Sequence, residues 1–397
     1  MEHRAKEKQE VRRKSQGVKR KDSMKNPGLY IHIPFCLRKC GYCDFYSVTS
    51  TPWIPQYMDA LLAEIEMYRG RFAGFDTVYF GGGTPSVLNP EHLRTILGTL
   101  RENFSLSSDT ERTVETNPAD LNLPVLEAML DMGINRLNIG IQSFDQKVLD
   151  VLGRRHSAEQ ADVAIEDARR AGFGNVGLDL IYGVPGQEVA SWLDTLNRAL
   201  SFGPEHLSCY QLTVEEGTPL GRRYARGEFI VPEEELQYQF FMKTSEVLEE
   251  AGYVHYEVSN YARGMSFASR HNQKYWDHSP YLGLGPSAHS FQDNQRWWNQ
   301  RSVEAYVSAI RSGDLPIEGK EVLSAEQLQL EALYLGLRTK KGIHLKEYAR
   351  RYQRDLLQEK RRLLMALQED GLISIKNGHL SPTHSGLAMA DSLAMIW

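Results

Sequence analysis

Three of the four cysteines in this 397-residue chain lie close together, at Cys36, Cys40 and Cys43 in a CxxxCxxC arrangement. A chain with so few cysteines does not have the composition of a disulfide framework. A tetrahedral zinc site would need a fourth ligand, and the residues just after the cluster supply none. Three thiolates at this spacing suit a 4Fe–4S cluster that leaves one iron open to an outside ligand. The remaining cysteine, Cys209, is predicted to be a small core residue.

The cysteine loop directly follows the first of a series of predicted strands, which alternate with amphipathic helical stretches. Strands are expected at 29–33, 77–80, 112–115, 136–141, 176–181 and 206–211, and helices at 56–68, 90–103, 124–132, 158–171 and 189–202. Strand–helix units in series indicate right-handed crossovers and a parallel sheet. No GxGxxG follows the first strand, so a dinucleotide-binding sheet is the weaker alternative. We therefore predict an α/β fold built on a partial (β/α)6 barrel similar to a TIM barrel.

Polar residues stand where the predicted strands end. Active sites of such barrels lie at the C-terminal ends of the strands. The residues at these positions are Gly82, Gly83 and Thr84 after the second strand, Glu115 ending the third, Gln142 and Arg154 following the fourth, and Asp179 in the fifth. Taken singly, the glycine run could be a tight turn and a carboxylate could be a helix cap. Their recurrence at successive strand ends, beside the cysteine loop, favours a binding site.

On its CxxxCx(aromatic)C motif the chain resembles the radical S-adenosylmethionine (SAM) superfamily. In that superfamily the open iron binds the amino and carboxylate groups of SAM, and electron transfer into the sulfonium releases a deoxyadenosyl radical. The resemblance implies that Gly82, Gly83, Thr84 and Glu115 hold the amino end of SAM, Arg154 its carboxylate and Asp179 with Gln142 its ribose, and that Tyr30 also contacts it.

The phrases YIHIPFC, FGGGTPS, IGIQSFD, LGRRH and DLIYGVPGQ, spread over residues 29–187, are similar to one branch of that superfamily. This branch holds the oxygen-independent coproporphyrinogen III dehydrogenases and the related HemW haem chaperones, and the later TVEEGTPL and HNQKYW segments extend the similarity. The dehydrogenases keep a further cysteine two positions after the third, where this chain has Phe45. The HNQKYW segment at 271–276 resembles the HNxxYW signature of the chaperones.

The resemblance thus implies a cytoplasmic haem chaperone that binds haem, a 4Fe–4S cluster and SAM and transfers haem to acceptor proteins. The alternative is an oxygen-independent coproporphyrinogen III dehydrogenase of porphyrin biosynthesis, so enzymatic activity is left undecided. His271 would contact haem, with Tyr275 and Trp276 as aromatic surface, and His278 and His289 are weaker candidates. The competing interpretation makes His271 a helix cap and the two aromatic residues part of the core.

Composition and charge divide the chain further. Residues 1–25 carry ten Lys or Arg against four Asp or Glu, and we expect residues 1–26 to form a disordered basic tail. The barrel is predicted over 27–260, a connector without a regular layer over 261–320, and a small winged-helix-like domain over 321–397. In that last domain we expect helices at 327–337, 345–352, 356–369 and 385–396, with a hairpin between the last two.

Binding partners are limited by the same composition. No apolar run approaches the roughly 20 residues that span a bilayer, so no transmembrane segment is expected. The tail could touch anionic lipid, although a dispensable extension ending near Met24 is favoured. Outside the tail the chain is acidic, which argues against binding nucleic acid through bulk charge.

Overall fold

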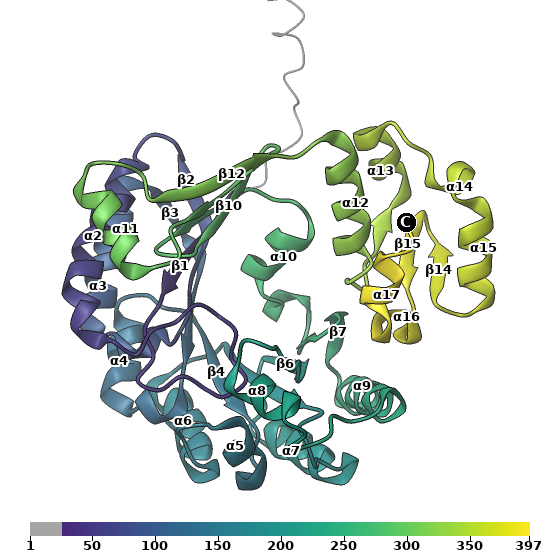
Figure 1. Ribbon diagram of the computed structural model, residues 1–397, viewed down its shortest axis with the longest axis horizontal. Coiled ribbons are helices and arrows are strands. Elements are labelled where there is room, and N and C mark those ends of the chain that lie inside the picture. Colours follow the sequence, from purple (N-terminus) through teal and green to yellow (C-terminus); the bar gives the residue numbers. More distant parts are fainter. Residues whose placement is uncertain (1–25) are drawn as a thin grey trace, which may run out of the picture.

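The computed structural model describes residues 26–397, so the predicted basic tail over 1–26 lies almost wholly outside the described residues. Two separate hydrophobic cores organise this part of the chain (Figure 1). The larger core lies between a twelve-stranded sheet and the helices packed against it, and the smaller one lies in the C-terminal domain. No helix among the described residues is long and apolar enough to cross a membrane.

Six consecutive parallel strands form the centre of the large sheet. They are β1 (Gly28–Ile33), β2 (Gly74–Gly82), β3 (Ser105–Thr116), β4 (Arg136–Gln142), β5 (Val176–Tyr182) and β6 (His206–Gln211). All six predicted strands are confirmed. β2 and β3 begin earlier than expected because their first residues pair with each other, Gly74 with Ser105 and Phe75 with Leu106. The start of β3 is mostly exposed and polar and carries no apolar pattern.

Helices connect these strands in the manner of β/α units. They are α2 (Ile54–Met67), α3 (Pro90–Asn103), α4 (Leu123–Asp131), α5 (Gln146–Leu152), α6 (Ala158–Ala171), α7 (Val189–Ser201), α8 (Pro219–Ala225) and α9 (Glu234–Glu250). Their starts follow from local chemistry. The Asn89 side chain accepts from the backbone N–H of His92, with Pro90 in the first turn, and Ser157 and Gln160 form a capping box.

Residues 254–322 extend the same sheet at both edges. The added strands are β7 (Val254–Glu257), β8 (Asn260–Ala262), β9 (Tyr281–Leu284), β10 (His289–Gln292), β11 (Gln295–Asn299) and β12 (Ile317–Val322). Helices α10 (Arg270–Trp276) and α11 (Val303–Arg311) lie between them. The prediction that this connector forms no regular layer was wrong. Its strands span three to six residues each and mix Gly, Asn and aromatic residues, so they show no strand period.

The C-terminal domain stands beside the sheet, drawn in yellow-green to yellow in Figure 1. Its elements are α12 (Ala325–Gly336), β13 (Ile343–His344), α13 (Leu345–Tyr352), α14 (Leu356–Glu359), α15 (Arg361–Glu369), β14 (Ile373–Lys376), β15 (His379–Pro382), α16 (His384–Ala388) and α17 (Ala390–Ala394). The predicted hairpin is confirmed, with Asn377 and Gly378 both at positive φ as its turn requires. The helices predicted at 356–369 and 385–396 are each divided, because Lys360 and Met389 leave the helical conformation.

One buried carboxyl group joins the sheet extension to the barrel. Glu64 of α2 accepts hydrogen bonds from the backbone N–H of Gly285 (2.8 Å), the side-chain amide of Asn299 (2.6 Å) and the hydroxyl of Tyr306 (2.7 Å). These donors come from the loop after β9, the end of β11 and α11. Burial raises the pKa of Glu64 to about 7. Sequence analysis missed Glu64, although an acid within the apolar stripe of a predicted helix was a visible signal.

Replacing Glu64 by glutamine should change the pH dependence of stability. Because folding raises the pKa of Glu64 above its value of 4.5, the protonated form stabilises the native state below that value. This contribution is lost as the pH rises through about 7. Between pH 5 and pH 8 the free energy of unfolding of Glu64→Gln should therefore rise by roughly 2 kcal/mol relative to the wild type in urea titrations. The exposed Glu66→Gln change on the same helix is the control and should show no such trend.

Candidate functional site

The cysteine loop is closed at its base and held on two sides. The backbone N–H of Cys36 donates to the carbonyl of Val48 (3.0 Å), and that of Val48 donates to Pro34 (2.7 Å). Within the loop, Gly41 donates to the carbonyl of Leu152 at the end of α5 and accepts from the N–H of Leu220 in α8. Backbone pairing therefore fixes the segment between residues 36 and 48 before any ligand is bound.

All three thiols of this loop are free, and none forms a disulfide. The sulfur of Cys36 lies 3.4 Å from the Thr84 hydroxyl, and Arg154 donates from Nη1 to the sulfur of Cys40 (3.3 Å). Burial raises the pKa of Cys43. Burying thiolates is costly unless a metal charge offsets the loss of hydration, so a free, partly desolvated set of three thiols fits an iron–sulfur cluster.

The glycine run after β2 is needed for the loop to lie where it does. The N–H of Gly83 donates to the carbonyl of Ile33 and that of Thr84 to the carbonyl of Phe35, both at 2.8 Å. A Cβ on Gly83 would stand 2.7 Å from the Phe35 oxygen, and Gly82 has a φ of +112°. Only glycine permits this approach, so the run brings Gly82, Gly83 and Thr84 against the start of the cysteine loop.

Two carboxyl groups face the interior of the sheet beyond the glycines. Glu115 accepts from the Tyr79 hydroxyl (2.7 Å) and from the N–H of Gly82 (3.3 Å), and burial raises its pKa to about 7. Asp179 accepts from the Asn138 amide at 2.8 Å, and burial raises its pKa to about 6. The negative charge of Asp179 also raises the pKa of Glu115, so the two carboxyls share one region.

Tyr79 and Asn138 were missed by sequence analysis. Tyr79 occupies the same face of β2 as Thr77 and Gly81, and Asn138 lies on β4 beside Glu115 of β3. The alternation of side chains along a strand was the available signal, because residues two apart point to the same face.

Arg154 is positioned between the cysteine loop and β4. Besides its contact with Cys40 it donates from Nη2 to the carbonyl of Gly140 (2.6 Å), while its buried Nε–H has no hydrogen-bond partner in the described chain. Gln142 follows at a bulge between β4 and β5 with a φ of +67°. A Cβ on Gly140 would lie 2.9 Å from the side-chain amide of Gln142, so a larger residue there would displace that side chain. An arginine with a donor left over suits an anionic group such as a carboxylate.

Tyr30 and His271 belong to an aromatic stack deeper in the sheet. The Tyr30 ring stacks on those of Tyr79 and His271, and its hydroxyl lies 3.1 Å from Nδ1 of His32. Nδ1 of His271 is 2.8 Å from the Thr77 hydroxyl, and its Nε2 is 2.9 Å from the Tyr275 hydroxyl.

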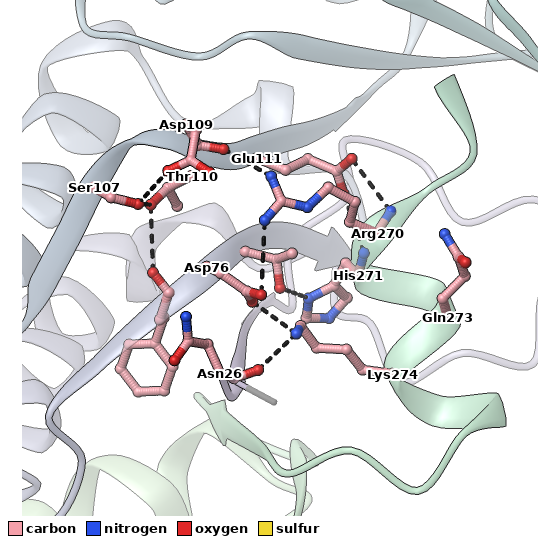
Figure 2. A network of polar contacts seen from close by, with 12 residues as sticks. Asn26, Asp76, Ser107, Asp109, Thr110, Glu111, Arg270, His271, Gln273 and Lys274 are labelled. Atoms are coloured by element: carbon pink, nitrogen blue, oxygen red, sulfur yellow. Dashed lines mark hydrogen bonds and ion pairs between the residues drawn. The ribbon is translucent and has the colours of Figure 1, made fainter. Parts of the chain in front are cut away.

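Figure 2 shows that α10 is bonded to the early parts of β2 and β3. Lys274 pairs with Asp76 (2.6 Å), and Glu111 accepts from the backbone N–H of His271 (3.1 Å). His271 is 1% exposed, and burial lowers its pKa to about 3, so its imidazole is neutral. Its partner Thr77 precedes Gly82 by five residues, roughly 16 Å along a strand.

The structure thus brings the cysteines, the glycine run, Glu115 and Arg154 together at one end of the sheet, with Asp179 and Gln142 on the adjoining strands. His271 lies deeper in the sheet and touches this group through Tyr79, on whose ring it stacks and whose hydroxyl donates to Glu115. The role of His271 as a haem ligand stays a prediction, and binding iron there would break one of its two ring hydrogen bonds.

Comparisons with known proteins agree with this arrangement. The sequence model of the radical SAM superfamily matches residues 30–199, and that of the HemN C-terminal domain matches residues 323–389. The Escherichia coli protein described as coproporphyrinogen III oxidase (HemN), a radical SAM enzyme, superposes with a TM-score of 0.82. At 24% identity over 94% of this chain and 90% of that one, the match shows the shared fold.

Curated relatives are more similar in sequence. The heme chaperone HemW of Mycobacterium tuberculosis is 35% identical over 92% of this chain and 93% of its own length. HemW of Bacillus subtilis is 34% identical over 92% of this chain and 97% of its own, and a mitochondrial radical SAM domain-containing protein 1 from Bos taurus is 34% identical over 92% and 86%. The chain therefore belongs to the HemW family of the radical SAM superfamily.

Proposed function

We propose that this protein binds a 4Fe–4S cluster and SAM and acts in the cytoplasm as a haem chaperone, passing haem to acceptor proteins. The proposal depends mainly on one observation, that the residue two positions after Cys43 is not a cysteine. Phe45 stands there with 71% of its surface exposed, so the loop offers three thiols and no fourth. The names of the curated relatives support the same function.

Cys36, Cys40 and Cys43 would hold the cluster, which supplies an electron to the sulfonium of bound SAM. Gly82, Gly83 and Thr84 would bind the amino end of SAM through their backbone. Glu115 would add a negative charge, because a nearby ammonium favours the ionised form of a carboxyl whose pKa is otherwise raised to about 7.

Arg154 would bind the carboxylate of SAM while its other N–H groups keep their contacts with Cys40 and Gly140. Its position between thiolate and carboxylate sites lets one cation stabilise two anions. Asp179, oriented by Asn138, would accept from the ribose hydroxyls, and Gln142 and Tyr30 would complete the contacts.

The second candidate function is oxygen-independent coproporphyrinogen III dehydrogenation, which the fold shared with HemN favours. Phe45 opposes it, because in the sequence resemblance the dehydrogenases keep a cysteine at that position. Binding of nucleic acid is not part of either proposal.

Replacing a cluster cysteine should abolish cluster binding. After anaerobic reconstitution, Cys36→Ala, Cys40→Ala and Cys43→Ala should each lose the sulfur-to-iron charge-transfer absorption, because three thiolates hold the cluster. Cys209→Ala is the matched control, since its thiol is buried in the core away from the loop. Full iron content in any of the three loop variants would contradict the assignment.

Replacing Arg154 should weaken SAM binding. In cluster-loaded protein we expect Arg154→Gln to raise the Kd for SAM by about tenfold or more in calorimetric titrations, since a charged hydrogen bond to the carboxylate is lost. Arg155→Gln is the control, because Arg155 pairs with Asp120 instead. Equal affinities of the two variants for SAM would show that Arg154 does not bind it.

The proposed function and its alternative can be separated on one anaerobic preparation. Cluster-loaded protein should bind haem in a spectrophotometric titration and pass it to an apo-haem protein. The same preparation, incubated with coproporphyrinogen III, SAM and reductant, should yield no protoporphyrinogen. Turnover in this assay would overturn the chaperone proposal and establish the dehydrogenase.

A further inference from the structure

A cavity of about 430 Å³ lies on the sheet extension, apart from the cysteine site. Side chains of β9, β10 and β11 line it, together with Glu321 of β12, His278, Tyr275 of α10 and Leu335 of α12. The volume falls in the range typical of small-molecule sites. One of the strands that line the cavity, β9, pairs directly with β1, and β1 leads into the cysteine loop.

Aromatic rings line this cavity on adjacent strands. Phe291 of β10 is the register partner of Tyr281 of β9, and His289 is the partner of Trp298 of β11. Because His289 and Phe291 are two residues apart, all four side chains share one face. The Tyr275 ring meets Tyr281 edge-on at 4.7 Å, and His289 is stacked with Trp298 at 5.8 Å.

The Trp298 ring lies against the neighbouring strand. Its cross-strand partner is Gly319 of β12, where a Cβ would stand 2.4 Å from a ring carbon. Glycine at that position leaves the indole free to lie against the backbone and present its other face. A flat aromatic wall of this kind suits a planar, largely apolar ligand.

Three histidines lie near these aromatic walls, and only in His289 do both ring nitrogens lack a hydrogen-bond partner among the described residues. Both ring nitrogens of His271 are hydrogen-bonded, to Thr77 and Tyr275. Nε2 of His278 faces the Glu331 carboxylate at 3.3 Å. Among the described residues no hydrogen bond to the side chain of His289 is found, and this side chain is exposed at the cavity. Partial burial in the cavity lowers the pKa of His289, which favours the neutral form of the imidazole that can bind a metal.

One cation stands at the same wall. Arg296 is the register partner of Phe291, and it pairs with Glu331 (2.8 Å) and Glu321 (3.1 Å). A guanidinium has five N–H donors, so these two contacts leave others for a carboxylate on a ligand.

We propose that this cavity is the haem site, in which His289 ligates the iron, Trp298 and Tyr281 contact the macrocycle and Arg296 faces a haem carboxylate. The proposal rests on the proposed function, because it names the site of the cargo that a haem chaperone must hold. Aromatic walls, a cation and an imidazole without a hydrogen-bond partner among the described residues occur together here, whereas both ring nitrogens of His271 in the HNQKYW helix are already bonded.

The test uses the full-length, cluster-loaded protein and two probes, ferric haem and metal-free protoporphyrin. His289→Ala should weaken haem binding by about tenfold or more and shift the Soret band, because the iron loses its ligand. Its affinity for metal-free protoporphyrin should stay unchanged, since the aromatic walls remain. Trp298→Leu should weaken binding of both probes, which gives a second variant should His289→Ala not fold. His92→Ala on α3 is the control and should match the wild type for both.

Three outcomes would overturn the proposal or its basis in distinguishable ways. A folded His289→Ala protein with wild-type haem affinity and Soret band would exclude His289 as the ligand. Loss of the haem spectrum in His271→Ala or His278→Ala, with His289→Ala unaffected, would move the site to those residues. Failure of the wild-type protein itself to bind haem would instead refute the proposed function.

Discussion

Two backbone hydrogen bonds, from Gly83 to Ile33 and from Thr84 to Phe35, position the glycine run against the cysteine loop at the candidate cluster site. They dock the glycine run of β2 onto the chain where β1 passes into the cysteine loop. The same approach places the Thr84 hydroxyl beside the sulfur of Cys36 and directs the N–H of Gly82 to Glu115. A side chain on Gly83 would separate these groups by steric contact with the Phe35 carbonyl.

Around that contact lie charged and ionisable side chains that a bound ligand would provide with hydrogen-bond and ion-pair partners. Burial raises the pKa values of Glu115 and Asp179, and the charge of Asp179 raises that of Glu115 further. Arg154 has a buried Nε–H without a hydrogen-bond partner among the described residues. Buried polar and ionisable groups that lack full compensation are costly in a low-dielectric interior. An ammonium, a carboxylate and hydroxyls on one ligand would satisfy them together, and SAM carries all of these groups.

The sheet extension gives this protein a second surface beside the cluster site. β9 continues the parallel sheet from β1, while the antiparallel strands β10 and β11 carry aromatic residues and pair with β12. Glu64 secures the extension to α2 through three hydrogen bonds. A cargo bound on the extension would therefore sit on a rigid continuation of the strand that carries the cysteine loop, which offers a physical route for coupling between the two sites.

The sequence alone determined the six parallel strands, the cysteine loop and the strand-end residues, because short apolar runs, glycine runs and cysteine spacing are local signals. It did not reveal β7 to β12, because these short strands have no period and because the pairs that join them to the central sheet, β9 with β1 and β8 with β6, are distant in the chain. It also did not place His271, since the HNQKYW helix carries the same residues whether its imidazole is free or bonded. Only the tertiary structure shows that His271 forms a hydrogen bond with Thr77, which lies nearly two hundred positions away in the chain. Likewise, only the tertiary structure shows that the ring nitrogens of His289 have no hydrogen-bond partner among the described residues.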